Sequence, residues 1–558
     1  MGVLMVQIAR IIGGAGTGKT TELLRLMEIN IRNGIDPFQI GFVSFTRAAR
    51  AEAASRAGAA FNHKATDLER AGWFRTLHSI CYKQLGIGAE LITDNVESKS
   101  WISEALDEPV SGASLAGEDQ TELSGAFDGQ PTDADRSLGL WGLSRSTMEP
   151  LADVVERVKL FDWQCPEYDD VCRVVRKYEM AKRVHGRCDF TDILGRFAGV
   201  RFSIEGHDEE GYEDGEVPDV PVWFLDEQQD TSALLDKVCR RLVEPARFAY
   251  MVLDPFQAIY SFSGSSSRHA MAWDVQKEKV LPKSHRCPKN ILELGEDILR
   301  QSSDYWDRKI QPNGPGGEIE RMPFGCGWAD EINPNDDWLL IARTNWQAKR
   351  MAGFLKDRNI PWIPTRGNGG WLECHRTKAT QALIDLQAGL YVMDFDWKHV
   401  VETLPTKVSD VELLVRGTKT IWKKRETSSP KAEEEQNARW VDGLTEWGAT
   451  PALIERIKTG RWSHLIKNGD EHVEAFKQWG RDAVMKPKVR VGTIHSVKGA
   501  QAMNVALLTT TSQKTAMTID NSPEQADEEH RIGYVAVTRC RKRLLILDEK
   551  TPFQMLIP

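Results

Sequence analysis

The first candidate for chemistry is a glycine-rich segment near the start of the chain. It matches the G-x-x-x-x-G-K-[ST] phosphate-loop pattern, and its residues are Gly13, Gly14, Ala15, Gly16, Thr17, Gly18, Lys19, Thr20 and Thr21. Glycines let consecutive backbone N–H groups turn toward phosphate oxygens, and the N-terminus of a following helix favours negative charge. Lys19 is expected to reach the β- and γ-phosphates, and Thr20 to hold Mg²⁺ through its hydroxyl. The pattern predicts a nucleoside triphosphate site, with a flexible glycine-rich turn as the alternative.

A second candidate is a pair of acids that ends an apolar run. Residues 222–225 read Val-Trp-Phe-Leu and are followed by Asp226 and Glu227. Beside a phosphate loop, Asp226 would orient the waters of Mg²⁺, and Glu227 would position and activate the attacking water. An acidic pair after a strand is also a common start signal of a helix. The catalytic interpretation predicts hydrolysis and disfavours a small-molecule kinase, which has no use for a water-activating glutamate.

These residues need strands and helices to position them. Residues 6–12 predict a strand before the glycine loop, and residues 19–27 predict the helix after it. Other strands are expected at residues 40–45, 220–225, 248–253, 338–342, 489–492, 505–509 and 544–547. Helical stretches separate them, for example at residues 48–60 and 148–194, so the pattern predicts α/β layers with parallel sheets.

Two intervals depart from this pattern. Residues 104–135 and 205–219 are acidic and rich in Gly, Ser and Pro, and they predict solvated loops. Residues 371–479 are helical in pattern and contain seven of the 18 tryptophans, with a basic stretch at Lys419–Arg425. That stretch is a candidate contact for duplex DNA, although an ordinary solvated helix face fits it equally well.

Composition narrows the class of protein. The chain has 558 residues, 41% hydrophobic and 27% charged, which is ordinary for a folded protein of several domains. The formal charge of −9 argues against a protein that coats nucleic acid through bulk charge. The nine cysteines include no CxxC pair, and no run of 18 apolar residues occurs, so a disulfide scaffold, a zinc ribbon and a membrane span are all disfavoured. Without a signal peptide, a reducing, cytoplasmic location is expected.

Beyond the phosphate loop and the acid pair, further segments resemble, in sequence and order, the UvrD/Rep/PcrA-type superfamily 1A DNA helicases. The matching segments are Ser44–Ala49, Thr76–Ser79, Asp189–Leu194, Leu253–Gly264, Leu281–Arg286, Thr493–Gly499 and Glu528–Arg539. The resemblance implies two RecA-like lobes, each with a mainly helical insertion. Lobe 1A would comprise residues 1–90 and 186–275, with insertion 1B at 91–185. Lobe 2A would comprise residues 276–370 and 485–558, with insertion 2B at 371–484.

The same resemblance implies further nucleotide contacts. Gln257 would sense the γ-phosphate or the attacking water. Arg286 and Arg539 would act as arginine fingers that neutralise charge as the γ-phosphoryl group leaves; an interface salt bridge is the alternative for each. His285 stands where relatives place a tyrosine that stacks on adenine, and Gln501 stands where many have a glutamate that contacts the ribose.

Other positions are implied to face single-stranded DNA, and they are Phe45, Thr76, His78, Phe190, Tyr260, Phe262 and His495. Aromatic rings stack on any base, which makes such contacts tolerant of sequence, although an isolated Phe or Tyr is more often a core residue. A few donors and rings along one channel would let an acidic protein hold DNA, with a modest salt dependence.

Together these features predict an ATP- and Mg²⁺-dependent 3′→5′ DNA helicase or translocase that acts on single-stranded DNA and on single-strand/duplex junctions. Two departures loosen the preference for ATP: only twelve residues precede Gly13, so the upstream adenine-reading glutamine motif is absent, and Thr21 replaces a frequent arginine. A translocase that strips proteins without unwinding, a motor that serves a separate nuclease or repair or replication partner, and a nucleotide-gated DNA-binding protein without turnover remain alternatives. The pathway served stays open among repair, replication, recombination and phage DNA metabolism.

Overall fold

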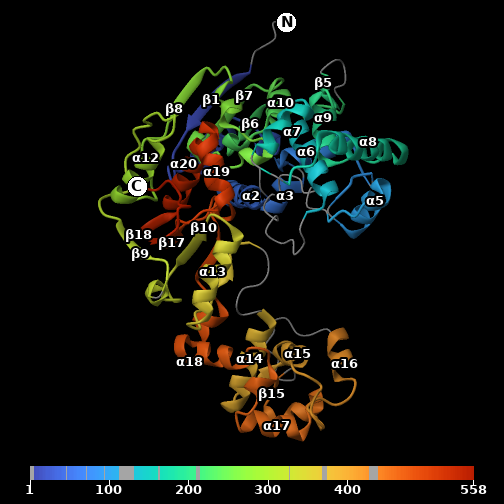
Figure 1. Ribbon diagram of the computed structural model, residues 1–558, viewed down its shortest axis with the longest axis vertical. Helices are drawn as coiled ribbons and strands as arrows, with labels where there is room; N and C mark the ends of the chain where they lie inside the picture. The colour runs from blue at the N-terminus through green and yellow to red at the C-terminus, as the bar shows by residue number, and fades with distance from the viewer. Residues whose placement is uncertain are drawn as a thin grey trace. The chain divides into compact units, whose positions relative to one another are not determined.

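The computed structural model describes residues 6–44, 47–70, 72–88, 90–93, 95–111, 131–160, 162, 164–208, 214–325, 327–366, 374–425 and 438–558. The chain forms two compact units, drawn in Figure 1. Unit 1 comprises residues 1–319, 511–544 and 551–558, and unit 2 comprises residues 320–510 and 545–550. Each unit is built around one six-stranded sheet. The fold is therefore α/β, as the alternation of strands and helices predicts.

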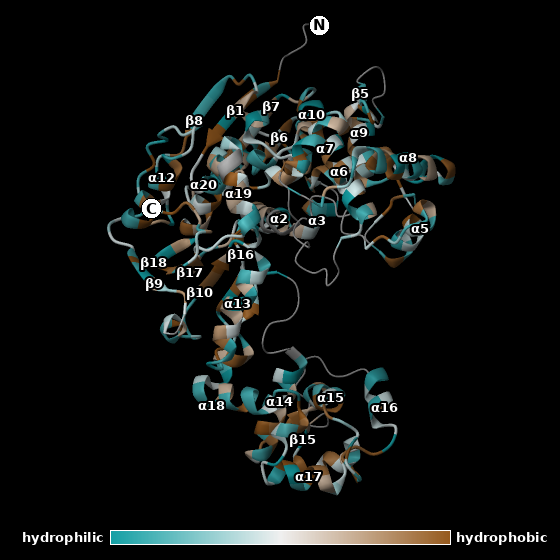
Figure 2. Cartoon of the chain, in the orientation of Figure 1, coloured by the Kyte–Doolittle hydropathy of each residue, from teal (hydrophilic) through white to brown (hydrophobic). Residues whose placement is uncertain are grey.

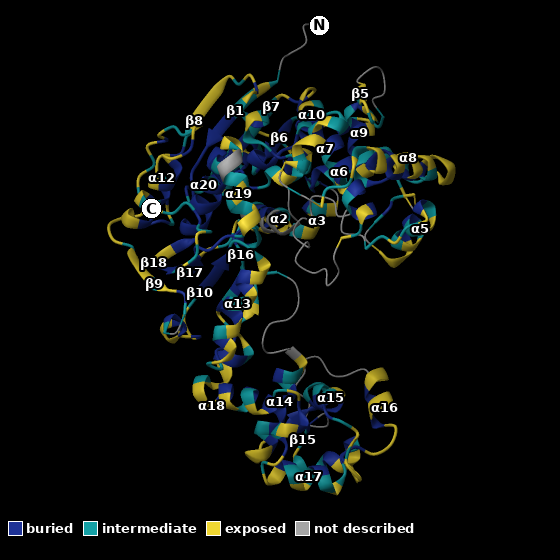
Figure 3. Cartoon of the chain, in the orientation of Figure 1, coloured by how far each residue is buried: buried dark blue, intermediate teal, exposed yellow. Residues whose placement is uncertain are grey.

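The sheet of unit 1 has the order β3-β2-β6-β7-β1-β8, and its neighbouring strands are parallel. The strands are β1 (Gln7–Ile12), β2 (Ile40–Val43), β3 (Trp73–Arg75), β6 (Val222–Leu225), β7 (Phe248–Leu253) and β8 (Lys277–Val280). Strands β2 and β6 are buried along their whole length, and β6 can be located in Figure 3. Successive residues point to opposite faces: Phe42 and Phe224 belong to one apolar cluster, whereas Val43 and Leu225 belong to another. Both faces are therefore covered, as a parallel sheet requires.

The helices of unit 1 are α1 (Lys19–Arg32), α2 (Arg47–Phe61), α3 (Ala65–Arg70), α4 (Leu77–Leu85), α5 (Val96–Leu106), α6 (Asp133–Thr147), α7 (Leu151–Lys159), α8 (Tyr168–His185), α9 (Phe190–Ala198), α10 (Ala233–Val243), α11 (Ser267–Met271), α12 (Lys289–Leu299), α19 (Gln513–Asn521) and α20 (Pro523–Val537). Helices α5 to α8 form a separate apolar core around Trp141, Val155 and Tyr178. The first acidic interval, residues 104–135, is helical at both ends, since α5 extends to Leu106 and α6 begins at Asp133; residues 112–130 lie outside the described residues. Part of the second acidic interval is ordered as a small hairpin of β4 (Arg201–Ser203) and β5 (Gly206–Asp208).

The sheet of unit 2 has the order β11-β16-β10-β17-β18-β9. Its strands are β9 (Glu318–Pro323), β10 (Trp338–Ala342), β11 (Ile363–Pro364), β16 (Val489–Thr493), β17 (Ala502–Leu508) and β18 (Cys540–Asp548). Strand β10 runs parallel to both β16 and β17, and it is buried and hydrophobic along its length (Figure 2). The chain passes from one unit to the other within β9, within β18, and at residues 510–511 and 550–551.

The remaining part of unit 2 is mainly helical, as its pattern predicts. Its helices are α13 (Asn345–Lys356), α14 (Cys374–Gln387), α15 (Asp394–Thr403), α16 (Thr418–Lys424), α17 (Pro451–Lys458) and α18 (Gly469–Met485). Two small antiparallel sheets interrupt them, formed by β12 (Val392–Met393) with β15 (Ala438–Arg439) and by β13 (Lys407–Val408) with β14 (Val411–Glu412). The indole N–H groups of Trp397 and Trp422 both donate to the carbonyl of Trp447, at 3.2 and 3.0 Å, and these three tryptophans, with Trp462, are part of the apolar core of this region.

Seven cysteines are free thiols, and they are Cys81, Cys165, Cys172, Cys188, Cys239, Cys287 and Cys540. Among the described helices, none combines the length and apolarity that crossing a bilayer requires.

Candidate nucleotide and nucleic-acid site

The glycine segment forms a loop between β1 and α1 of unit 1. Gly16 and Gly18 have φ angles of +70° and +81°, which side chains with a Cβ rarely adopt. A Cβ on Gly13 would lie 2.4 Å from Thr17 Oγ1, and one on Gly16 would lie 2.3 Å from the Cβ of Arg286. Helix α1 begins at the buried Lys19. The loop therefore has the curled backbone and the helix N-terminus that a phosphate site needs.

Three groups from distant segments of unit 1 hold the middle of this loop. The hydroxyl of Tyr534 accepts a hydrogen bond from the amide of Ala15 at 2.9 Å. The hydroxyl of Ser284 donates to the carbonyl of Ala15 at 2.8 Å, and the amide of His285 donates to the carbonyl of Gly16 at 2.7 Å. The side chain of His285 is exposed next to the loop. Residues of the predicted second lobe therefore line the phosphate loop within one compact unit.

The acid pair lies at the end of β6. Thr20 Oγ1 donates to Asp226 Oδ2 at 3.3 Å. Burial, and then the charge of Glu227, raise the pKa of Asp226 to about 7. Glu227 has a φ of +54°, an uncommon conformation for a residue with a Cβ, and its carboxylate accepts a hydrogen bond from the side-chain amide nitrogen of Gln229.

This oxygen pair suits Mg²⁺. An octahedral Mg²⁺ with metal–oxygen distances of about 2.0–2.1 Å spaces adjacent ligands about 3 Å apart, close to the separation of the Thr20 and Asp226 oxygens. A cation there would also favour the ionised form of Asp226. Thr20 and Asp226 therefore fit the predicted magnesium site.

Gln257 ends the short helix η4 (Pro255–Gln257), directly after β7. Its amide nitrogen donates to Asp254 Oδ2 at 2.8 Å, and its amide oxygen lies 3.4 Å from Nη2 of Arg539. The side chain is buried. It is thus held between an acid of the first sheet and one of the predicted arginine fingers.

Arg286 and Arg539 lie close to each other and to Glu227. Arg539 is 1% exposed, and burial, followed by the charge of Arg286, lowers the pKa of its guanidinium to about 9. Burial also lowers the pKa of Arg286, whose Nη1 donates to the carbonyl of Thr538 at 3.3 Å. A buried cation and a half-buried one that oppose each other's charge are stabilised by negative charge placed near both. This is the electrostatic arrangement expected of a triphosphate site.

A second buried arginine lies beneath the phosphate loop. The guanidinium of Arg308 donates to Asp254 Oδ1 at 2.5 Å and to Glu296 Oε1 at 2.7 Å, and it lies 3.4 Å from the Tyr534 hydroxyl. Burial alone would lower its pKa, but Tyr534, Asp254 and Glu296 outweigh burial and raise it. Sequence reasoning missed Arg308 because it lies in none of the recognisable segments, and it missed the role of Tyr534 although that residue lies within Glu528–Arg539.

Some of the predicted DNA contacts lie together in unit 1. Thr76 caps the N-terminus of α4, and the His78 ring makes an edge-on contact with Phe190, with ring centroids 5.8 Å apart. Burial lowers the pKa of His78 to about 4, so this ring is neutral at pH 7. Tyr260 and Phe262 also meet edge-on, at 6.0 Å, and Phe262 is 56% exposed. Phe45 lies outside the described residues.

An ionic cluster supports the element that carries Phe190. The Arg145 cluster consists of Arg145 on α6, Glu179 and Lys182 on α8, and Asp189 and Asp192 at the start of α9. Arg145 reaches Asp189 at 2.9 Å and Asp192 at 3.0 Å, and Lys182 reaches them at 3.1 and 2.7 Å. Asp189 and Asp192 also cap α9 reciprocally. Three helices are thereby joined at the position from which Phe190 projects.

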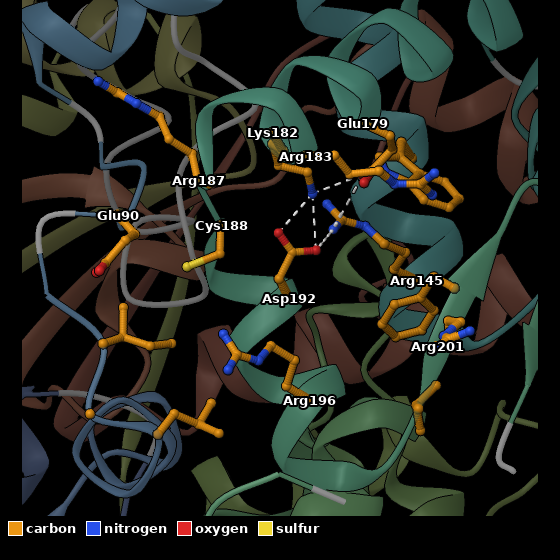
Figure 4. Close-up of a pocket in the computed structure, with 17 residues that line it drawn as sticks. Glu90, Arg145, Glu179, Lys182, Arg183, Arg187, Cys188, Asp192, Arg196 and Arg201 are labelled. Carbon is orange, nitrogen blue, oxygen red and sulfur yellow. Dashed lines mark hydrogen bonds and ion pairs between the residues drawn. The ribbon is translucent and has the colours of Figure 1, made fainter. Parts of the chain in front are cut away.

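Next to the Arg145 cluster is a cavity of about 780 Å³ whose lining contains more basic than acidic side chains. Figure 4 shows Lys182 between Asp192 and Glu179 in its wall, with Arg183, Arg187, Arg196 and Arg201 around it. The carboxylates of Glu179, Asp189 and Asp192 lie close enough to share a metal ion. However, these carboxylates already form ion pairs with Lys182 and Arg145. We therefore interpret the Arg145 cluster as a structural contact that holds α6, α8 and α9 together.

Two predicted site residues belong to unit 2. Gln501 precedes β17, and its carbonyl accepts a hydrogen bond from Arg490 at 2.9 Å. His495 begins the short helix η10 (His495–Val497), directly after β16. The other predicted residues described above are in unit 1.

Known families match both parts of this arrangement. A family model described as the UvrD/REP helicase N-terminal domain matches residues 5–274, and one described as the UvrD-like helicase C-terminal domain matches residues 406–551. The phosphate loop, the acid pair and Gln257 fall within the first match, and Arg539 falls within the second.

Curated relatives match at low identity. The ATP-dependent DNA helicase PcrA of Staphylococcus epidermidis is 22% identical over 388 residues, which is 64% of this chain and 49% of the relative. The ATP-dependent DNA helicase UvrD1 of Mycobacterium tuberculosis is 24% identical over 341 residues, which is 55% of this chain and 39% of the relative. The chain thus spans about half the length, or less, of these relatives.

Proposed function

The chain belongs to the UvrD/Rep helicase family, and from that premise we propose that it is an ATP-driven DNA helicase or translocase. The observation that supports this function most strongly is the pair of guanidinium groups at the half-buried Arg286, beside the phosphate loop, and the buried Arg539, beside Gln257. Such a pair is costly to bury unless a polyanion offsets its charge. A nucleoside triphosphate in the loop would supply that charge.

In this proposal each residue has a defined task in ATP hydrolysis. Lys19 and the loop amides bind the phosphates, while Thr20 and Asp226 hold Mg²⁺, which offsets negative charge on the β- and γ-phosphates. Glu227 orients and deprotonates the attacking water. Gln257 senses the γ-phosphate, and Arg286 and Arg539 stabilise the charge that develops as it leaves. His285 and Gln501 are the proposed base and ribose contacts.

The proposed substrate is single-stranded DNA, including its junctions with duplex. The exposed ring of Phe262, with Tyr260, provides a stacking surface, and Thr76, His78, Phe190 and His495 provide further contacts. Alternating grip on the strand, driven by closure and reopening of lobes 1A and 2A, would produce stepping. The likeness of Asp254–Gly264 and Glu528–Arg539 to the UvrD branch supports 3′→5′ movement. The division into 1A, 1B, 2A and 2B, with 1B and 2B as accessory DNA or partner contacts, is part of the same proposal.

The test is the ATPase rate of the full chain with and without single-stranded DNA, combined with unwinding of 3′- and 5′-tailed duplexes. We expect DNA to stimulate hydrolysis, only the 3′-tailed duplex to be unwound, and Glu227→Gln to lose at least 100-fold in kcat. Glu244→Gln, at an exposed glutamate that ends α10, is the matched control and should behave as wild type.

Other outcomes assign one of the alternatives. Stimulation by DNA without strand separation would indicate a translocase that strips proteins. Unwinding of 5′-tailed duplexes alone would refute the polarity. Tight nucleotide-dependent DNA binding without turnover, unchanged in Glu227→Gln, would refute the enzyme and indicate a nucleotide-gated binding protein.

A further inference from the structure

A continuous buried network joins the phosphate loop to Gln257. It starts at the Ala15 amide, which donates to the Tyr534 hydroxyl at 2.9 Å. Tyr534 lies 3.4 Å from Arg308 Nη2 and 3.4 Å from Asp254 Oδ2. Asp254 accepts the amide hydrogen of Gln257 at 2.8 Å. The path from loop to sensor therefore passes through three side chains.

The hydroxyl of Tyr534 has its hydrogen-bonding capacity filled by these contacts. It accepts from Ala15 and Arg308 and donates to Asp254, which uses one donor and two lone pairs. Tyr534 is fully buried, and the side chains of Arg308 and Asp254 are 0% exposed. Water does not reach these buried groups, so each depends on its protein partners for its hydrogen bonds.

Arg308 is held rigidly. Its guanidinium lies over the rings of Phe256, at 4.6 Å, and Tyr534, at 5.2 Å, while its two terminal nitrogens bond Asp254 and Glu296. Planar stacking with forked hydrogen bonds is a geometry that lysine cannot reproduce. Arg308 therefore fixes which oxygen of Asp254 is left for Gln257.

The phosphate loop lies next to Tyr534 and Arg308. A Cβ on Gly14 would lie 3.2 Å from the Tyr534 hydroxyl and 3.4 Å from Arg308 Nη1, so the loop backbone rests directly on both groups. At the other end of the network, the Gln257 amide oxygen lies 3.4 Å from Arg539. A shift of the loop would thus displace Tyr534, Asp254 and Gln257 together.

We propose that Tyr534 and Arg308 are positioning residues that set the orientation of Gln257 according to the position of the phosphate loop. The inference rests on the proposed ATPase function. It assigns the two residues to hydrolysis and to discrimination of the γ-phosphate through Gln257, rather than to the binding of ADP, because both contact Asp254, which bonds Gln257. Loss of the Tyr534 hydroxyl, or of the Arg308 fork, would leave Gln257 in place but misaligned.

The test is a double-mutant cycle on the full chain, with Tyr534→Phe, Arg308→Lys and Gln257→Ala. In wild-type background we expect each of the first two to lower the DNA-stimulated kcat at least tenfold, with the Kd for ADP changed less than threefold. In Gln257→Ala background both should change kcat less than twofold. Tyr305→Phe is the matched control, because its hydroxyl bonds Glu296 at 3.3 Å but does not contact the loop, and it should keep wild-type kcat.

A merely structural role gives different results. Equal losses of kcat in both backgrounds, or loss of ADP binding in parallel with kcat, would overturn the proposal. If the wild-type protein does not hydrolyse ATP, the proposed function fails. The proposed link between the phosphate loop and Gln257 can then still be tested by nucleotide binding. Tyr534→Phe should then shift the ratio of the Kd values for ATPγS and ADP tenfold, and an unchanged ratio would refute the network.

Discussion

The two aspartates of the Arg145 cluster should differ sharply in their effect on stability. Asp189 accepts hydrogen bonds from Arg145, Lys182, the Tyr178 hydroxyl and the Asp192 amide. Burial opposes its ionisation, but Arg145 and Lys182 outweigh burial and hold the pKa of Asp189 well below its ordinary value. For Asp192, burial and the charge of Asp189 raise the pKa. The surroundings in the folded state therefore favour the charged form of Asp189 and disfavour the charged form of Asp192.

The magnitude follows from what each asparagine substitution leaves behind. Asp189→Asn removes one carboxylate from two buried cations that keep Asp192 and Glu179 as partners, so we expect a cost at the lower end of the about 3–5 kcal/mol for breaking a buried ion pair. Asp192→Asn removes a charge that its surroundings disfavour, so we expect a cost under about 1 kcal/mol. The Asp189 contribution is present above its unfolded pKa of about 3.9 and is lost only as the pH falls through the lower folded pKa. The difference in stability cost between Asp189→Asn and Asp192→Asn should therefore persist from pH 5 to pH 8.

Amide hydrogen exchange of α8 and α9 measures this difference locally, which suits a chain of two units. A loss of about 3 kcal/mol accelerates exchange about 150-fold, at 1.36 kcal/mol per tenfold. Asp189→Asn should show this acceleration, and Asp192→Asn less than about fivefold. Asp169→Asn, at an exposed position on α8, is the control. Equal acceleration in the two cluster variants, or a larger effect of Asp192→Asn, would refute the charge assignment.

Two further changes test local energetics. Gly139 lies at an exposed position within α6, where a Cβ would meet no atom within 4 Å. Gly139→Ala should therefore stabilise unit 1 by about 0.5–1 kcal/mol, measured by urea unfolding. A destabilised variant would show that this face of α6 is not open. Burial raises the pKa of Asp396 on α15 to about 6, so its contribution to stability is present below pH 4 and lost as the pH rises through 6. Asp396→Asn should therefore stabilise unit 2 by about 1–2 kcal/mol at pH 8 and less at pH 5, measured by unfolding at both pH values; an effect independent of pH would show that the charge is not the cause.

The sequence predicted the strands that are short, apolar and buried. The runs at residues 248–253 and 338–342 coincide with β7 and β10, because burial on both faces requires a continuous apolar run. Strand β18 begins earlier than its apolar run, at Cys540, since Arg541 and Lys542 are exposed in its first half. The sheet of β12 and β15 could not be predicted, because two-residue strands that pair across a long separation leave no local pattern.

The residues around the phosphate loop illustrate the limit of motif recognition. Lys19, Asp226 and Gln257 were identified from the sequence segments in which they lie, and the structure places all three in unit 1. Helix α20 instead buries a charged run, in which Asp527 bonds Ser303 and Glu528 bonds Ser261. Charged runs are usually solvated. Only the tertiary partners, which come from distant segments, explain why this run and Arg308 are buried.

The hydrogen bond between Ala15 and Tyr534 spans 519 residues of sequence and has a consequence for biosynthesis. At about 5–20 residues per second, roughly 25–100 s pass between translation of the two partners. During that interval α12 lacks its contact with α20, including the one between Ile298 and Gly533. The phosphate loop therefore gains its bond to Tyr534 only after α20 has been synthesised.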